Sequence, residues 1–386
     1  MGKSSPRPNP IILVAGGTGG HIFPAAALAR ELHARGYTLA LFTDRRGGYG
    51  GDLDAVDTHR IRAGRVTTGG LAARLRGAAE LALGALQARR LLRELSPSIV
   101  VGFGGYASVP TMLAATRAHI ATVIHEQNAL LGRANRWLAR SVTAIATSFA
   151  DVAGIHPQAR RKVTLTGNPV RQEILALRDQ PYPAPQTHGS IRLLVLGGSQ
   201  GATVFSDVIP AALARLTRGL RTRLKLRQQC RPEDIARVRR SYANLGVEAE
   251  LAAFFEDMPQ RLGDAHLVIC RAGATTVAEL TAAGRPAILV PFPHALDDHQ
   301  TANARAVQAG GGAVLMPQPT FTPQTLSARL KLLLDNPLGL RRMAERSRGL
   351  GQPQAAARLA DLVASLCPSN GEEASNSGPG AREEAA

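Results

Sequence analysis

A histidine, His21, closes the glycine-rich run GGTGGH at residues 16–21, directly after the apolar segment 11–15. Glycines after a buried strand allow a tight turn and let a ligand approach bare backbone N–H groups. An imidazole at the lip of such a turn can bind phosphate when it is charged or accept a proton when it is neutral. The run is not the dinucleotide-binding fingerprint, because Ile22 stands where that fingerprint has glycine or alanine. A plain strand-to-helix turn is the alternative interpretation.

Four polar residues, His125, Glu126, Gln127 and Asn128, follow the apolar segment 122–124. Parallel α/β folds bind ligands at the carboxyl ends of their strands, and a strand end needs no such polar density for stability. The cluster therefore indicates acid–base or hydrogen-bonding chemistry. Taken singly, His125 or Glu126 can equally be an ordinary hydrogen-bonded side chain.

Two further glycine-rich turns follow apolar segments. One is GFGGYAS at residues 102–108, which contains Tyr106, and the other is GGSQGA at residues 197–202. Glycines at a strand end favour a backbone that approaches a large anionic ligand, with an ordinary β–α turn as the alternative. Because similar units recur half a chain apart, the sequence predicts two similar halves with a cleft between them. That arrangement suits a reaction between two substrates.

A helix that starts with free N–H groups is predicted in the run RAGATTVAE at residues 271–279. Such groups bind phosphate, and Glu279 can accept hydrogen bonds from both ribose hydroxyls, with a solvated helix surface as the alternative. Farther on, Asp297, Asp298 and His299 are residue types that bind metals, but no further ligand is evident. Hydrogen bonding to sugar hydroxyls is therefore favoured over metal binding at this run.

Apolar strand-like segments alternate with helical segments along the chain, which is typical of βαβ units around parallel sheets. The predicted fold class is α/β, with two domains for 386 residues. We place an N-terminal domain at 10–178, a proline-rich linker at 179–190 and a C-terminal domain at 191–367, whose last helix is free to pack back on the first domain. Residues 1–9 and 368–386 are expected to form a disordered lead and tail. Strands are predicted at 11–15, 38–42, 98–102, 122–124, 143–146, 162–165, 192–196, 224–228, 267–270 and 287–290, and helices at 23–35, 81–95 and 359–366.

The chain is strongly basic, with a net charge of +17, and most of the excess falls on its first half. Positive charge attracts nucleic acid, anionic lipid or phosphorylated substrates. An aromatic content of 4% weakens the case for binding single-stranded nucleic acid by base stacking. No apolar run approaches the roughly 18 residues of a membrane-spanning helix, and three scattered cysteines fit a reducing compartment.

Residues 71–93 mix leucine and alanine with five arginines and a single acidic residue, Glu80. A basic amphipathic helix of this kind can lie on an anionic membrane surface. An equally good interpretation is a helix that packs its apolar side on the core and exposes its basic side to solvent.

Seven motifs occur in order between residues 16 and 304: GGTGGH, GFGGYAS, HEQN, GNPVR, GGSQGA, RAGATTVAE and DDHQTANA. Together they resemble those of the MurG family of bacterial glycosyltransferases. The resemblance implies a GT-B fold, with two Rossmann-like domains facing across a cleft. It also implies an inverting hexosyltransferase that moves GlcNAc from UDP-GlcNAc to the MurNAc 4-hydroxyl of lipid I (undecaprenyl-pyrophosphoryl-MurNAc-pentapeptide), giving lipid II for peptidoglycan synthesis. A peripheral position at the cytoplasmic face of the plasma membrane is implied as well, with no cofactor, no metal and no nucleic-acid partner.

The resemblance also assigns residues to the site. His21 is the first candidate for the catalytic base, because neutral imidazole is available near pH 7, and Glu126 is the second. Tyr106 and His125 are expected on the acceptor side, and Arg271 near the charge that develops on the β-phosphate. Residues expected to bind UDP-GlcNAc are Thr18, Gly19, Gly20, Asn128, Arg171, Ser199, Phe255, Arg271, Ala274, Thr275, Thr276, Val277, Ala278, Glu279 and Gln300.

Two other classes of function stay open at the level of sequence. The first is another GT-B enzyme acting on a UDP-sugar, such as a lipid-sugar transferase or a UDP-GlcNAc epimerase, and dependence of UDP release on lipid I separates these. The second is a basic module that binds nucleic acid or membrane. Such a module has no use for seven polar strand-end motifs, and its mark would be salt-dependent DNA binding without affinity for UDP-sugars.

Overall fold

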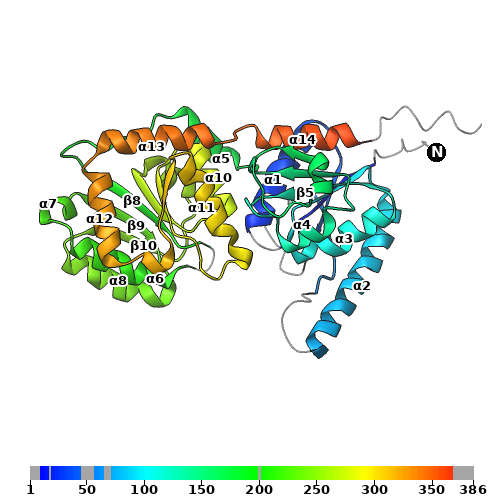
Figure 1. The fold of residues 1–386 in the computed structure, drawn as a ribbon, viewed down its shortest axis with the longest axis horizontal. Coiled ribbons are helices and arrows are strands. Elements are labelled where there is room, and N and C mark those ends of the chain that lie inside the picture. Colours follow the sequence, from blue (N-terminus) through cyan, green and yellow to red (C-terminus); the bar gives the residue numbers. More distant parts are fainter. Residues whose placement is uncertain (1–8, 17–18, 45–55, 65–70, 199–200, 368–386) are drawn as a thin grey trace, which may run out of the picture.

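A computed structural model describes residues 9–16, 19–44, 56–64, 71–198 and 201–367 and forms two α/β domains side by side (Figure 1). Each domain is built on one parallel sheet. The sequence therefore predicts the fold class correctly. Except for Asn9, the segments expected to be a disordered lead (1–9) and tail (368–386) lie outside the described residues.

The N-terminal domain has the strand order β3-β2-β1-β4-β5-β6-β7. Its strands are β1 (Ile11–Val14), β2 (Leu39–Thr43), β3 (Asp57–Arg60), β4 (Ile99–Gly102), β5 (Ala121–Glu126), β6 (Ala144–Thr147) and β7 (Val163–Leu165). The helices around this sheet are α1 (Gly19–Ala34), α2 (Leu71–Leu95), α3 (Gly105–Arg117), α4 (Arg133–Leu138), the 3-10 helix η1 (Pro157–Lys162) and, from the end of the chain, α14 (Ala355–Leu366).

The C-terminal domain has the strand order β10-β9-β8-β11-β12-β13. Its strands are β8 (Ile191–Leu196), β9 (Leu224–Gln229), β10 (Glu248–Ala252), β11 (Leu267–Cys270), β12 (Ala287–Leu289) and β13 (Ala313–Leu315). Its longer helices are α6 (Thr203–Ala214), α8 (Pro232–Asn244), α10 (Ala274–Ala283), α11 (His299–Ala309), α12 (Pro323–Leu334) and α13 (Pro337–Leu350). Short helices complete it: α5 (Gln172–Leu175), η2 (Ala176–Asp179), α7 (Arg218–Arg221), α9 (Met258–Asp264), η3 (Leu296–Asp298) and η4 (Gln318–Thr320).

The central strands of the first sheet end together. Val14 of β1 is in register with Gly102 of β4, and Gly102 is in register with Ile124 of β5. These strands are apolar along their whole length because helices cover both faces of the sheet. The glycine-rich turns after β1 and β4 and the polar cluster at the end of β5 therefore meet at one edge of the sheet.

Three side chains that precede the predicted boundary at residue 178 pack with the C-terminal domain. Val170, Ile174 and Leu177 are buried in one apolar cluster with Leu194 and Val268 of that domain. Residues 180–190 do connect to β8 without helix or strand.

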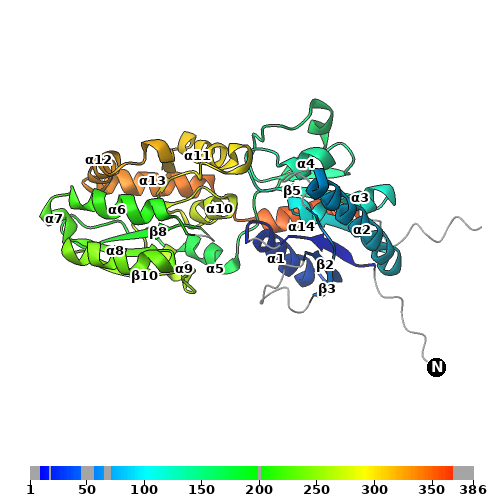
Figure 2. The same ribbon diagram turned by 90° about the horizontal axis from the view of Figure 1, so that it is seen from below.

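The last helix returns to the first domain. Leu359 and Val363 of α14 are fully buried in the core of the N-terminal domain, beside residues of β1 and α1. An ion pair of 2.6 Å joins Arg35, after α1, to Asp361. Helices α13 and α14 lie along the same side of the molecule, one over each domain, and α14 lies beside α1 (Figures 1 and 2).

Helix α2 is longer than the predicted helix at 81–95 and projects from the N-terminal domain (Figure 1). It packs against α3, with Ala88 and Leu92 buried. Within the described ranges, no helix combines the length and apolar character that crossing a bilayer requires.

Candidate functional site

His21 lies in the first turn of α1, against the turn that follows β4. Gly104 and Gly105 have φ of +86° and +72°, conformations that glycine adopts without steric cost. A Cβ atom at Gly105 would lie 3.3 Å from His21 Nε2, and one at Gly104 would lie 3.6 Å from the ring. The positive φ at both positions and the 3.3 Å approach at Gly105 therefore favour glycine in the turn beside the imidazole.

Burial lowers the pKa of His21 below its ordinary value, and the nearby Glu126 carboxylate opposes this effect. His21 Nδ1 is buried and has no hydrogen-bond partner in the described part of the chain. The ring is therefore neutral at pH 7 and able to accept a proton.

Glu126, at the end of β5, has all of its acceptor capacity in use. Oε1 accepts from the backbone N–H and the side-chain Nδ2 of Asn128, both at 3.0 Å. Oε2 accepts from the Gly132 N–H at 2.8 Å and from Asn135 Nδ2 at 2.9 Å. Since a carboxylate offers about four lone-pair sites, Glu126 organises the loop between β5 and α4.

His125 does not face the site, contrary to the expectation from the sequence. Its side chain is fully buried, Nε2 lies 3.0 Å from the Gly167 carbonyl oxygen and Nδ1 lies 3.1 Å from Gln127 Nε2. These contacts require Nε2 to donate and Nδ1 to accept, and burial lowers the pKa of His125 to about 4. His125 is a neutral core residue because neighbouring residues in a strand point to opposite faces.

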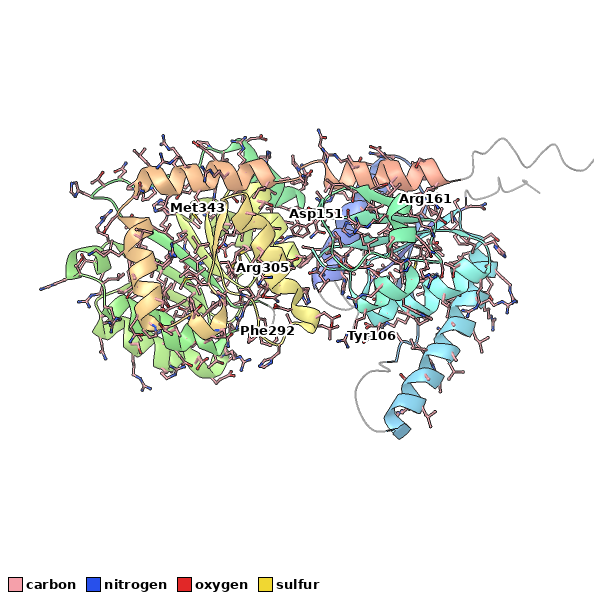
Figure 3. The ribbon with its side chains drawn as sticks, in the orientation of Figure 1. Tyr106, Asp151, Arg161, Phe292, Arg305 and Met343 are labelled. Carbon is pink, nitrogen blue, oxygen red and sulfur yellow. The ribbon has the colours of Figure 1, made fainter. Side chains whose placement is uncertain are left out.

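A cavity of about 160 Å³ lies in front of these residues, with walls from both domains. Among the predicted residues it exposes His21, Tyr106, Glu126 and Asn128. The C-terminal domain adds Leu296, Asp297 and His299, and Arg133 donates three hydrogen bonds to Asp297, the shortest of 2.6 Å. Tyr106 and Phe292 lie on opposite sides of the gap between the domains in Figure 3. No group of three or more His, Cys, Asp or Glu side chains in the described ranges is placed to hold a metal ion.

Asn303, which the sequence analysis does not assign to the site, connects the domains at this point. It is fully buried in α11, donates to Asn128 Oδ1 at 3.0 Å and to the Ala272 carbonyl at 3.1 Å, and accepts from the Ala129 N–H at 2.8 Å. The available signal is a polar residue in the run DDHQTANA, one turn after His299 and beside the apolar residues Ala304 and Val307.

The start of α10 has N–H groups without a side-chain cap, since Gly273 at the N-cap offers no side chain. Thr275 Oγ1 is buried and has no partner among the described residues. Glu279 Oε1 accepts from Arg171 Nε at 2.9 Å and from Arg171 Nη2 at 2.7 Å. Burial raises the pKa of Glu279, and Arg171 opposes that shift. Thr275, Thr276 and Glu279 lie on one face of the helix.

The other residues of the predicted run point elsewhere. Ala274, Val277 and Ala278 line a second cavity on a different face of α10. Their side chains are therefore not placed to contact a ligand held by Thr275, Thr276 and Glu279.

Three acceptors of the C-terminal domain hold the Arg271 guanidinium. Its Nη1 donates to the carbonyl oxygens of Val290 and Pro291, both at 3.1 Å, and its Nη2 donates to Gln318 Oε1 at 2.8 Å. That Arg271 meets the β-phosphate stays a prediction.

Gln300 bridges two loops of the C-terminal domain. Its Oε1 accepts from the Phe292 N–H at 2.9 Å and from the Ala272 N–H at 3.2 Å. Because two backbone donors fix the oxygen, the Nε2 group is the one left to meet a ligand.

The remaining predicted residues divide into three groups. Phe255 is buried beneath Arg261, whose guanidinium carbon lies 4.0 Å from the ring centroid, so only its backbone can reach a base. Gly19 and Gly20 open α1. Thr18 and Ser199 lie outside the described residues.

The chain is similar to known glycosyltransferases. Residues 11–147 match the glycosyltransferase family 28 N-terminal domain and residues 192–362 match the family 28 C-terminal domain. Proteins from Paramagnetospirillum magneticum and Rhodospirillum rubrum are each 58% identical to this chain, over 93% and 94% of it and 97% and 95% of their own lengths. Both are named UDP-N-acetylglucosamine–N-acetylmuramyl-(pentapeptide) pyrophosphoryl-undecaprenol N-acetylglucosamine transferase.

Solved structures give the same fold. The chain is similar to crystalline MurG of Acinetobacter baumannii, with 30% identity and a TM-score of 0.76 over 93% of this chain and 100% of that one. A UDP-GlcNAc 2-epimerase of Neisseria meningitidis has a TM-score of 0.64 at 16% identity, which shows a shared fold alone.

Proposed function

This chain belongs to glycosyltransferase family 28, and on that premise we propose that it transfers N-acetylglucosamine from UDP-GlcNAc to the MurNAc 4-hydroxyl of lipid I, giving lipid II. One observation carries the proposal. Relatives with 58% identity across 95% or more of their own length have names that state this transfer. For the alternative that the chain is a UDP-GlcNAc epimerase, the only support is the shared fold.

The C-terminal domain binds the sugar nucleotide in this proposal. The uncapped N–H groups of α10, with Thr275 and Thr276, meet the negative charge that develops on the diphosphate as UDP leaves. Glu279, fixed by Arg171, accepts hydrogen bonds from the ribose. The backbone at Phe255 holds the uracil.

The N-terminal domain presents the acceptor to His21. Neutral His21 takes the proton of the attacking hydroxyl while the hydroxyl displaces UDP in one step, which inverts the anomeric centre. Tyr106 and Arg133 form the acceptor side of the cavity. Glu126 acts as a positioning residue, because its oxygens hold Asn128, Gly132 and Asn135.

Gln300 reads the donor sugar through its Nε2 group, since its Oε1 is occupied by two backbone donors. A hydrogen bond lost in a buried site costs about 1–3 kcal/mol. Gln300→Ala should therefore reduce the preference for UDP-GlcNAc over UDP-GalNAc by about ten-fold in competition kinetics. Unchanged discrimination would exclude Gln300 from this role.

Helix α2 provides the contact with an anionic membrane at the cytoplasmic face. Leu75, Leu83 and Leu86 are 63%, 48% and 63% exposed and share one side of the helix by their spacing. Arg89 and Arg93 line a groove between α2 and α3, together with Leu86. Exposed leucines beside arginines are the composition that binds the surface of an anionic bilayer.

The direct test is a transfer assay with purified full-length protein, labelled UDP-GlcNAc and lipid I or a short-chain lipid I analogue. Formation of a disaccharide-linked lipid that depends on both substrates supports the proposal. Release of UDP at the same rate without the lipid, or conversion of UDP-GlcNAc to its 2-epimer, contradicts it.

A further inference from the structure

Arg285, which directly follows α10, is a buried cation that the proposed mechanism does not use. The residue is 1% exposed, and arginine is seldom buried to this extent without a partner for its charge. Burial lowers the pKa of Arg285 from its usual value, but an arginine side chain stays protonated in proteins. Its hydrogen-bond partners in the described part of the chain are all backbone carbonyls.

These carbonyls belong to the C-terminal ends of two helices. The guanidinium Nε donates to the Leu262 carbonyl at 2.9 Å and Nη2 donates to the Gly263 carbonyl at 3.0 Å, both in the last turn of α9. Nη1 donates to the Ala283 carbonyl at 2.8 Å and to the Gly284 carbonyl at 3.4 Å, at the end of α10. Carbonyls at a helix C-terminus lack intrahelical donors and carry the negative end of the helix dipole. One cation therefore joins the C-terminal ends of α9 and α10.

The last turn of α9 is also connected to the segment that holds uracil in the proposed function. Arg261, which precedes Leu262, places its guanidinium carbon 4.0 Å from the ring centroid of Phe255. Its Nε donates to Asp257 Oδ1 at 2.5 Å, and its Nη1 and Nη2 each donate to the Glu250 carboxylate at 2.7 Å. The position of α9 therefore sets the position of the Phe255 backbone.

Helix α10 carries the other groups that contact the nucleotide in the proposed function. Thr275, in its first turn, meets the diphosphate, and Glu279, one turn later, meets the ribose. Because both residues belong to one helix of ten residues, the position of its C-terminal end affects both contacts. Helices α9 and α10 also pack against each other. The distance between the base contact and the ribose and diphosphate contacts thus depends on how these two helices are joined.

We propose that Arg285 is a positioning residue for the donor nucleotide. Its guanidinium fixes α9 against α10, so that one nucleotide reaches the Phe255 backbone with its base and the groups of α10 with its ribose and diphosphate. The inference rests on the proposed function and adds to it a residue that touches no substrate. Lysine cannot replace Arg285 in this role, because a single nitrogen lacks the planar fork that spans both helix ends.

Arg178 provides a matched control at the same end of α10. Its Nη1 donates to the Ala282 carbonyl at 3.4 Å and to the Arg348 carbonyl at 3.0 Å. It therefore joins α10 to α13 and makes no hydrogen bond to α9 among the described residues. Arg178→Met removes an arginine from this helix end but leaves the connection between α9 and α10 in place.

The test compares the affinities of the full chain for UDP and ADP, measured by calorimetry in the wild type, Arg285→Met, Arg285→Lys and Arg178→Met. ADP has the ribose and diphosphate of UDP but a different base, so it reports the contacts that α10 makes alone. Both Arg285 variants should bind UDP about ten-fold or more weakly and ADP as the wild type does. Arg178→Met should keep the wild-type preference for UDP. A variant that is only less stable loses affinity for both nucleotides in the same proportion, so the ratio separates positioning from stability.

Arg285→Lys keeps the positive charge among the carbonyls and serves as the test if Arg285→Met does not fold. An unchanged preference for UDP over ADP in a folded Arg285 variant, or an equal loss of preference in Arg178→Met, would overturn the role of Arg285 and leave the donor assignment intact. Failure of Arg285→Lys to fold would also overturn it, because the residue would then be a requirement of the fold. A wild type that binds UDP no better than ADP would contradict the donor assignment itself, and this inference with it.

Discussion

Single residues at the edge of the first sheet create the chemistry of the candidate site. Gly104 and Gly105 leave room for the His21 ring, burial keeps that ring neutral, and Glu126 fixes the loop beside it. The sequence predicts that these residues meet, because parallel strands end at a common edge. It does not predict how Glu126 is used, since its partners Gly132 and Asn135 are set by the loop that follows.

Glu126→Gln tests whether Glu126 positions the loop or acts as the base. In the wild type, N–H donors point at the carboxylate oxygens of Glu126. The glutamine replaces one of these oxygens by an NH2 group, so we expect the free energy of unfolding to fall by about 3 kcal/mol. We expect kcat to fall at least ten-fold, while the acidic limb of the pH profile stays where it is. Loss of that limb would instead identify Glu126 as the base. Glu173→Gln, at a side chain that is 58% exposed, is the control.

Contacts from distant parts of the chain decide how two of the predicted residues are held. The carbonyls of Val290 and Pro291, at the end of the neighbouring strand, accept hydrogen bonds from the Arg271 guanidinium. His125 follows an apolar strand as predicted, yet the Gly167 carbonyl from the β7–α5 connection pairs with its ring. In both cases the partner is about 20 or more residues away, beyond the reach of local patterns.

At the scale of elements, each predicted strand is present and the missed strands are β3, β10 and β13. All three lie at edges of the described sheets. Edge strands are half solvated and need not form a continuous apolar run. The DTHR sequence of β3 and the EAELA sequence of β10 are examples, so the signal used for the central strands is weak there.

Helix α2 combines the features of both interpretations, because one side packs against α3 while leucines on another side are exposed. Leu86→Glu should reduce binding to anionic phospholipid vesicles about ten-fold or more, since it removes a side chain whose burial contributes about 1.5–3 kcal/mol and adds a negative charge. Flotation of protein with vesicles measures the effect. Leu332→Glu in α12, an equally exposed leucine at 63%, is the control and should bind like wild type. Equal losses for both variants would contradict a membrane face on α2.

At the scale of the whole molecule, the chain crosses between domains twice. It passes into the second domain after Gly167 and comes back through Gln352 to α14. These crossings touch, because a Cβ at Gly167 would lie 2.6 Å from the Gln352 Cβ. Local sequence patterns predict the returning helix as an element, but not the packing of Val170, Ile174 and Leu177 with the C-terminal domain.

Helix α14 should be required for the stability of the N-terminal domain. Leu359→Ala removes a fully buried side chain from that domain's core, and we expect a loss of about 2–5 kcal/mol. Native-state hydrogen exchange of the backbone amides of β1 and α1 reports unfolding of this domain. Leu332→Ala, at an exposed site in the other domain, is the control. Unchanged exchange of these amides in Leu359→Ala would contradict this role.

The most direct measurement is the pH dependence of kcat/KM for transfer to lipid I, compared between the wild type and His21→Asn. The pKa of His21 lies below 6.5 in the free protein, so the wild-type rate should fall only as pH drops through a value below 6.5, where the base becomes protonated. His21→Asn should lower the rate about 10²–10⁴-fold and abolish this acidic limb. A variant that keeps the wild-type rate and the same acidic limb would contradict the assignment of His21 as the base.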